Sequence, residues 1–387
     1  MEVEELLRSW DHDHSIILGK LDYISKTLQQ RQDLSKAELL PRAQQPTQVS
    51  APSTPPHHEV YRGQPEGPHI SSPLSGEAAL WLKQHDPSII SACKSATAGE
   101  VLAAKAAIDA VCARHGLQRS DLQAHLGILG LDVETVDEDA VNVKKMLQEL
   151  ADDGGWTVSY NHGLRVLYRH LRNTKVHSVK MQAEFEAPMW HVMALMVEFD
   201  LTSTWNTHMQ DTVILHSELP LLTCIYGGLW TPFLLFDTVA KAEAFDIGLE
   251  DRSVLARLSN LSDAEVELYG PLPPAHKKRR RATIGSGSCF RLEPLPPGPD
   301  GKHRTRATAM AHINPHLPFV PAFLVNFILR VASPFAYRMM SKVLKELFKE
   351  PDSIFNQRIA ARPEVYQMCK DRTKHLMMYH YGVHIDV

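Results

Sequence analysis

The sequence predicts an α+β protein in which a long C-terminal helix covers a curved antiparallel sheet, with a helical region on the N-terminal side. Two observations lead to this fold class. Short segments with alternating apolar and polar residues recur between 156 and 313, as expected of strands, and a strongly apolar helix follows at about 318–349. Because such a sheet needs a cover and such a helix cannot stand in solvent, we expect the two to pack together.

Composition limits the class of protein. The 387 residues are 44% hydrophobic, with 41 basic and 45 acidic residues, which excludes wholesale disorder and a broadly basic nucleic-acid coat. The five cysteines form no CxxC pair, and their odd number fits a reduced, cytoplasmic protein. The acidic start is neither a signal nor a transit peptide, and prolines interrupt the most apolar window, 317–336. We expect a cytoplasmic protein with peripheral membrane contact.

Residues 1–30 predict an amphipathic helix. Apolar residues alternate at spacings of four and three along it, the pattern of a coiled-coil seam: Val3, Leu7, Trp10, Ile17, Leu21, Ile24 and Leu28, with His14 also on the stripe. One interpretation is a short coiled coil for self-association or a protein partner. The other is a helix that folds back on its own protein.

Two regions separate this helix from the sheet. Residues 31–77 are rich in Gln, Pro, Ser and His and cannot bury enough apolar surface to offset chain entropy, so we expect a disordered linker. Residues 78–134 favour a helical subdomain, with Gly116 as a helix stop.

Residues 135–350 carry the predicted sheet domain. A helix is expected at 139–151, then three strands, then a helix that Pro188 opens. The expected strands are 156–160, 164–171, 176–185, 212–217, 221–226, 235–245, 253–260, 282–292 and 304–313. A second proline-rich stretch, 271–299, is predicted to be a loop and part of a strand inside this domain.

Several strings in this order resemble the StAR-related lipid-transfer (START) domain, a helix-grip fold, over about residues 135–350. They are Trp205-Asn206, the strand entry Phe236-Asp237-Thr238-Val239, and the approach to the last helix from Ile313-Asn314-Pro315 to Asn326. The resemblance implies a tunnel that holds one lipid, gated by the C-terminal helix and by the loop between the fifth and sixth strands.

That loop, 227–234, begins with two glycines and contains Trp230 and Phe233. An apolar loop tip is typical of a binding surface, and a tryptophan suits a membrane interface. The loop is therefore either a membrane-touching lid or a turn whose aromatic side chains plug the core.

Segment 235–245 alternates small and polar residues. Phe236, Ala240 and Ala242 share one face with Thr238 and Ala244. Small residues suit a cavity wall, although a strand packed tightly under a helix would look the same. Some START domains carry a charged pair inside the tunnel. In the register set by Asp237, the basic member of that pair falls on Ala242, so the pair is not evident here and the identity of the lipid remains open. The remaining predicted lining residues are Trp205, Phe323, Phe327, Ile328 and Val331.

The sharpest charge run is Lys277, Lys278, Arg279, Arg280 and Arg281. It has three interpretations, namely a solvated loop, a patch attracted to anionic lipid head groups, and a nuclear address.

No catalytic residue, cofactor or metal is predicted. The sequence lacks GxSxG, Walker and GxGxxG motifs, and its 21 histidines show no metal-ligand spacing on a helix. A nucleophile at Cys224 has no supporting motif. The leading hypothesis is a lipid-binding and lipid-transfer protein without enzymatic activity. The alternatives are an adaptor that uses its N-terminal helices and a helix-grip enzyme. Residues 351–387 form a C-terminal extension to which the sequence assigns no role.

Overall fold

The computed structural model describes residues 87–385, except 121, 124–130, 172, 231–234 and 318–321. Within helices and strands, only the backbone is described for Pro87, Trp230, Ala322, Phe323, Leu324, Phe327, Ile328, Val331 and Leu347. The helix expected at 1–30 and the linker expected at 31–77 lie outside the described residues.

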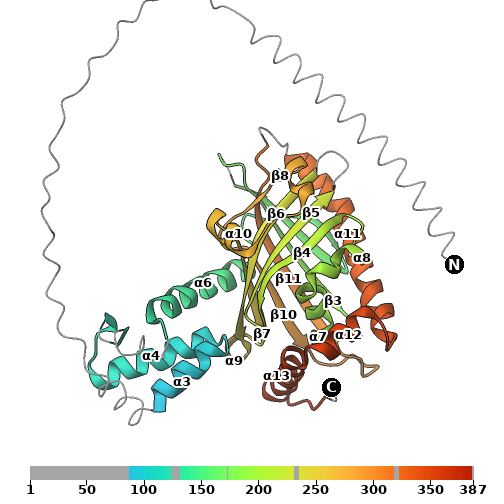
Figure 1. Ribbon diagram of the computed structural model, residues 1–387. Helices are drawn as coiled ribbons and strands as arrows, with labels where there is room; N and C mark the ends of the chain where they lie inside the picture. Colours follow the sequence, from blue (N-terminus) through green and yellow to red (C-terminus); the bar gives the residue numbers. More distant parts are fainter. Residues whose placement is uncertain are drawn as a thin grey trace, which may run out of the picture. The chain divides into compact units, whose positions relative to one another are not determined.

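Eleven strands form one sheet (Figure 1). They are β1 (Thr157–His162), β2 (Leu164–His170), β3 (His177–Phe185), β4 (Met209–Glu218), β5 (Leu222–Trp230), β6 (Leu235–Ile247), β7 (Ser253–Asn260), β8 (Arg280–Arg281), β9 (Thr283–Ile284), β10 (Cys289–Leu295) and β11 (Arg304–Asn314). Their order is β1-β2-β3-β11-β10-β7-β6-β5-β4, with β8 on β6 and β9 on β11. Neighbours are antiparallel apart from the short β8–β6 pair, so the predicted antiparallel sheet is confirmed.

The helices follow the predicted order. They are α3 (Pro87–Thr97), α4 (Val101–His115), α6 (Val133–Ala151), α7 (Met189–Val197), α8 (Thr202–Trp205), α9 (Gly248–Asp251), α10 (Asp263–Tyr269), α11 (Ala322–Glu346), α12 (Ile354–Ala361) and α13 (Pro363–Tyr381), with single 3₁₀ turns η1 (Phe199–Leu201), η2 (Pro274–Lys278) and η3 (Leu347–Lys349). A helix, three strands, further helices, the remaining strands and a long helix make the START-like, helix-grip arrangement that the sequence predicts.

Two predicted boundaries are wrong for local reasons. α6 begins at Val133 rather than 139, because the Asp132 carboxylate accepts hydrogen bonds from the backbone N–H groups of Glu134 and Thr135 and caps the helix. The single strand expected at 282–292 is two strands, β9 and β10. Gly287, at φ +87°, turns the chain between them.

Side chains alternate between the two faces of the sheet. On the outer face, α3, α4 and α6 pack against Phe245, Ile247, Leu255, Cys289 and Met310. On the inner face, α7, α11, α12 and α13 share a second core cluster with the strand residues Leu164, Val166, Val179, Ala183 and Leu292. Figure 1 shows α6 and α11 on opposite sides of the sheet.

Lys180 fixes α6 to the outer face. Its buried ammonium donates to the carbonyl oxygens of Glu149, Leu150 and Asp152 at 3.0, 3.1 and 2.8 Å, and it contacts Asp153 Oδ1 at 3.0 Å. The last carbonyls of a helix have no partner within the helix and carry partial negative charge. A cation on β3 therefore satisfies the end of α6 and sets where the helix lies.

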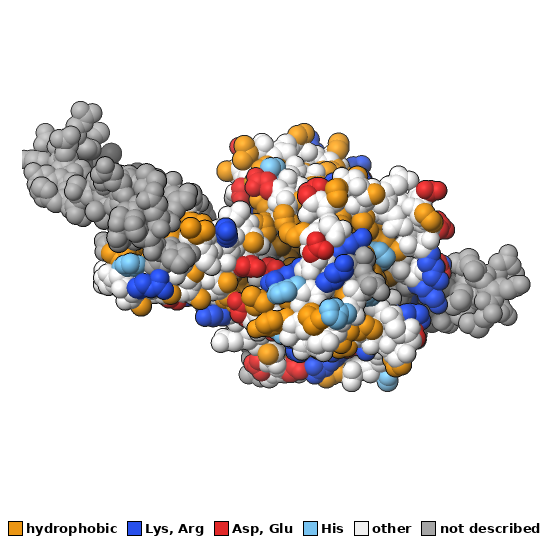
Figure 2. Space-filling view, turned by 90° about the horizontal axis from the view of Figure 1, so that it is seen from below, with side chains coloured by type: hydrophobic (Ala, Val, Ile, Leu, Met, Phe, Trp, Pro, Cys, Tyr) orange, Lys and Arg blue, Asp and Glu red, His pale blue; other side chains and the backbone are white. Residues whose placement is uncertain are grey.

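Residues 351–387 belong to the same structural unit as the sheet. α12 and α13 contribute Phe355, Val365, Tyr366 and Cys369 to the inner-face core. The fully buried Glu198, just after α7, accepts hydrogen bonds from Arg362 and from the Tyr366 hydroxyl. On the side of the domain where α13 lies, apolar side chains are interspersed with charges of both signs (Figure 2).

Candidate functional site

Uncharged side chains, six of them alanine, line the inner face of the central strands. Strand register places them opposite one another from β5 to β11, and the set comprises Ile225, Thr238, Ala240, Ala242, Ala244, Ala256, Leu258, Phe290, Ala309 and Ala311. Ala240 is buried and the others are half-buried. None of them belongs to a core cluster among the described residues.

The same strands are packed differently on the outer face. Leu255, Cys289 and Met310 alternate with the inner-face residues and are each 0% exposed. A side chain in the middle of a sheet and under a helix is expected to be fully buried when the space above it is filled. The partly exposed inner face therefore differs from the packed positions of the outer face.

Ionisable side chains are absent from the middle of this inner-face set. On β6 the first to appear is Asp246, at the end of the strand, where Arg372 of α13 holds it at 2.7 Å. Two buried polar groups lie on this side of the sheet. The Thr238 hydroxyl and the indole Nε1 of Trp205 are buried and have no hydrogen-bond partner within the described part of the chain. Each could bind one polar atom of an otherwise apolar molecule.

The structure brings part of the predicted lining set together. Phe236, Ala240 and Ala242 share the inner face of β6. Trp205 ends α8 and packs at the margin of the inner-face core. The predicted residues Phe323, Phe327, Ile328 and Val331 lie on α11, but their side chains are not among those described.

The α11 helix is attached to one side of the sheet. The Arg330 guanidinium donates to the Ser159 carbonyl oxygen of β1 at 2.9 Å, and the Tyr337 hydroxyl donates to the Glu184 carbonyl oxygen of β3 at 3.1 Å. Tyr337 also packs on Phe185, with ring centroids 5.4 Å apart. These contacts hold the helix over β1, β2 and β3, at one end of the alanine-rich set.

The predicted gate loop begins later in the chain than the sequence suggests. β5 continues through Gly227 and Gly228 to Trp230. A Cβ on Gly227 would lie 2.9 Å from the Phe199 ring, and one on Gly228 would overlap the Arg279 guanidinium. Close packing, not loop flexibility, accounts for these glycines. Phe233 and the Trp230 side chain lie outside what the structure describes.

The basic run is partly folded into the protein. Arg281 pairs with the buried carboxylate of Asp237 at 2.6 Å, where β8 joins β6 on its outer side. Arg279 pairs with Asp211 at 2.6 Å and donates to the Tyr226 hydroxyl at 3.0 Å.

The other three residues of the run are exposed to solvent. Arg280 is exposed and donates to the His316 carbonyl oxygen at 2.8 Å. Lys277 and Lys278 end the 3₁₀ turn η2 and are exposed.

The described residues place neither the Cys224 nucleophile considered from the sequence nor a metal-ligand group on the inner face. Cys224 points to the outer side of β5, where it joins Tyr226, Val239 and Leu261 in a separate cluster. Burial raises the pKa of its thiol, which keeps it protonated and a poor nucleophile. Among the described residues, no three His, Cys, Asp or Glu side chains are grouped to hold a metal ion, and no helix is long and apolar enough to cross a membrane.

The element order and strand topology decide the fold. The domain is START-like. Solved structures similar to it include human STARD10, with 15% identity, a TM-score of 0.46 and coverage of 57% of this chain and 86% of that one. Human StAR-related lipid transfer protein 5 has 18% identity, a TM-score of 0.45 and coverage of 55% and 97%. No protein-family model and no curated protein matches the chain.

Sequence reasoning missed the inner-face residues of β7, β10 and β11. A usable signal was present in β11, where Ala307, Ala309 and Ala311 repeat the small-residue alternation of β6. A second alanine-rich strand favours an open inner face more strongly than one strand alone. The polar contacts at Glu198 and Asp246 gave no such signal, because each partner lies more than a hundred residues away in the chain.

Proposed function

We propose that this protein binds one lipid molecule between the inner face of the sheet and α11, and that it transfers this lipid between membranes. The observation that carries the proposal is the contrast between the two faces of the central strands. Leu255, Cys289 and Met310 on the outer face are completely buried, whereas the inner face is apolar, rich in alanine and partly exposed. The names of the similar structures, which include a lipid transfer protein, agree with this interpretation.

The driving force would be physical rather than chemical. Each buried CH₂ group contributes about 0.8 kcal/mol, so a tail of about sixteen carbons contributes about 12 kcal/mol before the entropy of binding is subtracted. The hydroxyl of Thr238 and the indole N–H of Trp205 would each offer one hydrogen bond to the lipid. Without a charge among the alanines, we expect the buried part of the lipid to be uncharged.

Membrane contact is the second part of the proposal. Opening would involve α11 and the 231–234 segment. The exposed Lys277, Lys278 and Arg280 would attract anionic head groups at about 1 kcal/mol per basic residue. Because Arg279 and Arg281 are paired within the protein, they would contribute less to this attraction.

One pair of variants tests whether the inner face is a cavity or a packed core. Ala309 on β11 and Cys289 on β10 are small residues on opposite faces. If the inner face holds a lipid, Ala309→Phe fills that space and abolishes lipid extraction from vesicles with little change in Tm. Cys289→Phe overpacks the outer core and destabilises the protein by about 1–3 kcal/mol.

Native mass spectrometry of the wild-type protein purified from cells supplies the direct measurement, and we expect one lipid per chain. An empty wild-type chain that extracts nothing from vesicles would overturn the proposal, as would equal destabilisation by the two variants.

A further inference from the structure

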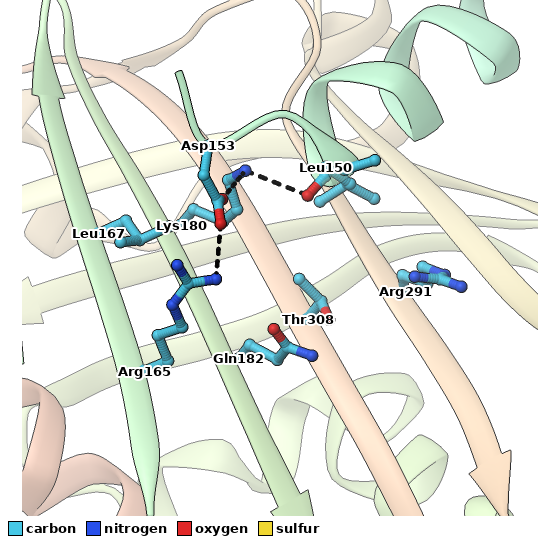
Figure 3. A pocket seen from close by; sticks show the side chains of 9 residues that line it. Leu150, Asp153, Arg165, Leu167, Lys180, Gln182, Arg291 and Thr308 are labelled. Carbon is cyan, nitrogen blue, oxygen red and sulfur yellow. Dashed lines mark hydrogen bonds and ion pairs between the residues drawn. The ribbon is translucent and has the colours of Figure 1, made fainter. Parts of the chain in front are cut away.

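A polar pocket lies on the outer face, on the opposite side of the sheet from the proposed lipid site. Its volume is about 220 Å³, equivalent to roughly seven water molecules at about 30 Å³ each. It is bounded by the end of α6 and by strands β2, β3, β11 and β10, and Figure 3 shows it from close by. Its lining comprises Leu150, Ala151, Asp153, Arg165, Leu167, Lys180, Gln182, Arg291 and Thr308.

One row of the sheet forms the floor. Arg165 on β2 is opposite Gln182 on β3, Gln182 is opposite Thr308 on β11, and Thr308 is opposite Arg291 on β10. Figure 3 shows the two arginines on either side, with the amide and the hydroxyl between them. Four strands therefore present a continuous row of hydrogen-bonding side chains to the same space.

The hydrogen bonds within the protein leave much of this row unused. Lys180 is fully engaged by the end of α6 and Asp153. By contrast, neither the Gln182 amide nor the Thr308 hydroxyl has a hydrogen-bond partner in the described residues, although Thr308 is only 6% exposed. Arg165 contacts one carboxylate oxygen of Asp153 at 2.7 Å, which occupies only part of its five-donor fork.

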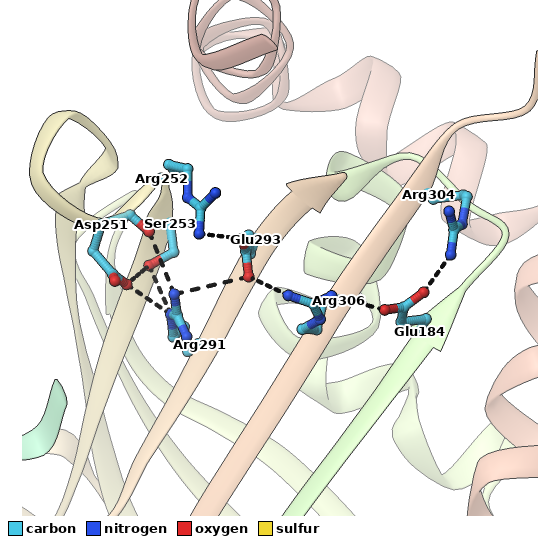
Figure 4. Close-up of polar contacts among 8 residues, drawn as sticks. All are labelled: Glu184, Asp251, Arg252, Ser253, Arg291, Glu293, Arg304 and Arg306. Carbon is cyan, nitrogen blue, oxygen red and sulfur yellow. Dashed lines mark hydrogen bonds and ion pairs between the residues drawn. The ribbon is translucent and has the colours of Figure 1, made fainter. Parts of the chain in front are cut away.

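Arg291 is held by residues that lie outside the pocket lining. Its Nε contacts Asp251 Oδ2 at 2.7 Å and the Ser253 hydroxyl at 3.1 Å, and it begins a ladder of ion pairs that continues through Glu293, Arg306 and Glu184 to Arg304 (Figure 4). This support fixes the guanidinium at the edge of the pocket, as a preorganised binding group requires.

Basic residues outnumber acidic ones in the pocket lining. Three lining residues are basic and one, Asp153, is acidic, while Asp251 and Glu293, which lie outside the lining, pair with Arg291. Burial acts to raise the pKa of Asp153, but hydrogen bonds from Lys180 and Arg165 outweigh it and lower that pKa, so the carboxylate is ionised and already neutralised by these two partners.

We infer that this pocket binds a phosphate monoester, either as a free small molecule or as the head group of a lipid. The arginine fork suits a phosphate, and the Gln182 amide and the Thr308 hydroxyl add donors from separate directions, which matches an anion with several acceptor oxygens better than a two-oxygen carboxylate. The volume accommodates the phosphate group together with a short organic substituent.

Two substitutions with opposite expected effects on binding test this site in the full chain. Arg165→Gln removes the guanidinium that has fewer partners within the protein, and it should weaken binding of glycerol 3-phosphate about tenfold. Asp153→Asn removes the carboxylate that competes with the ligand for Arg165 and should strengthen binding. Calorimetric titration at fixed ionic strength measures both effects.

Arg252→Gln is the matched control. Arg252 is 46% exposed, against 40% for Arg165, and each faces a carboxylate, Glu293 at 3.4 Å for Arg252 and Asp153 at 2.7 Å for Arg165. Because Arg252 lies on the same face but outside the pocket lining, its loss should leave glycerol 3-phosphate binding unchanged. An equal loss in Arg165→Gln and Arg252→Gln would show a non-specific charge effect and overturn the inference.

A second experiment distinguishes a soluble phosphate ester from a lipid head group as the ligand. Vesicles of phosphatidylcholine with and without phosphatidic acid are floated with the wild type, Arg165→Gln and Arg252→Gln. Binding to glycerol 3-phosphate that depends on Arg165 supports a soluble ligand. Flotation that depends on phosphatidic acid and on Arg165, without binding of the soluble ester, supports a head group. The inference is wrong if neither probe shows binding that depends on Arg165.

Discussion

Leu255 and Leu258 lie on the same strand and differ in the face on which they lie. Leu255 points to the outer face and is completely buried beneath the N-terminal helices, whereas Leu258 points to the inner face and is half-buried. Both side chains are apolar. The difference shows that the helices on the outer face cover Leu255 completely, while Leu258 on the inner face is less completely covered. Apolar content alone does not distinguish a packed core from a binding surface.

The largest expected effect comes from testing this pair directly. Leu255→Ala should destabilise the protein by about 2–5 kcal/mol, because it leaves a cavity in a filled core. Leu258→Ala should cost less than about 1 kcal/mol, because less of its surface is removed from water. Urea denaturation measures both losses. Similar losses for the two leucines would remove the distinction between the faces.

A smaller effect tests what keeps the outer face covered. Lys180→Met removes the donor that satisfies the end of α6 and should destabilise the protein by about 2–3 kcal/mol. Faster hydrogen exchange in the last turn of α6 should accompany it. The exposed Lys145→Met on the same helix serves as the control and should change stability by less than about 0.5 kcal/mol. Unchanged exchange in Lys180→Met would contradict the role assigned to this ammonium.

The last effect depends on pH and concerns a titratable group on the inner-face side. His191 on α7 stacks on Phe348 with ring centroids 4.1 Å apart. Burial, with help from the positive charge of Lys370 and from His303, lowers its pKa to about 4. Between this value and its ordinary value of 6.5, the folded protein binds fewer protons than the unfolded chain. Stability should therefore fall by up to about 1.4 kcal/mol per pH unit as the pH decreases through that window.

His191→Phe isolates this contribution, because it keeps a ring beside Phe348 and cannot be protonated. The difference between the wild-type and variant stability profiles from pH 7 to pH 4 is the quantity to measure. Parallel profiles would assign the acid sensitivity to other groups, such as His177, where burial also lowers the pKa.

Local patterns made most of the fold predictable. Period-2 alternation located β6, β7 and β11 closely, because each strand has one face that differs in kind from the other. The errors occur where a distant residue decides the local structure. Gly227 and Gly228 lie in a strand because Phe199 and Arg279 pack against them.

The candidate site was less predictable for the same reason. Most of the alternation along β6 could be seen in the sequence, but whether those alanines face a filled or an open space depends on how α11 lies over the sheet. The basic run gave a similar ambiguity. Asp211 and Asp237, which hold two of its arginines, lie more than forty residues before those arginines and belong to other strands.

The contribution of α12 and α13 to the inner-face core has a consequence for synthesis. β3 is made early, but one of its edges stays unpaired until β11 emerges from the ribosome, and Phe355 and Tyr366 arrive later still. The domain therefore cannot complete its core until α12 and α13 have been made, and until β11 is made β3 has an exposed edge. The helices α12 and α13 then close the core around strands that were made much earlier.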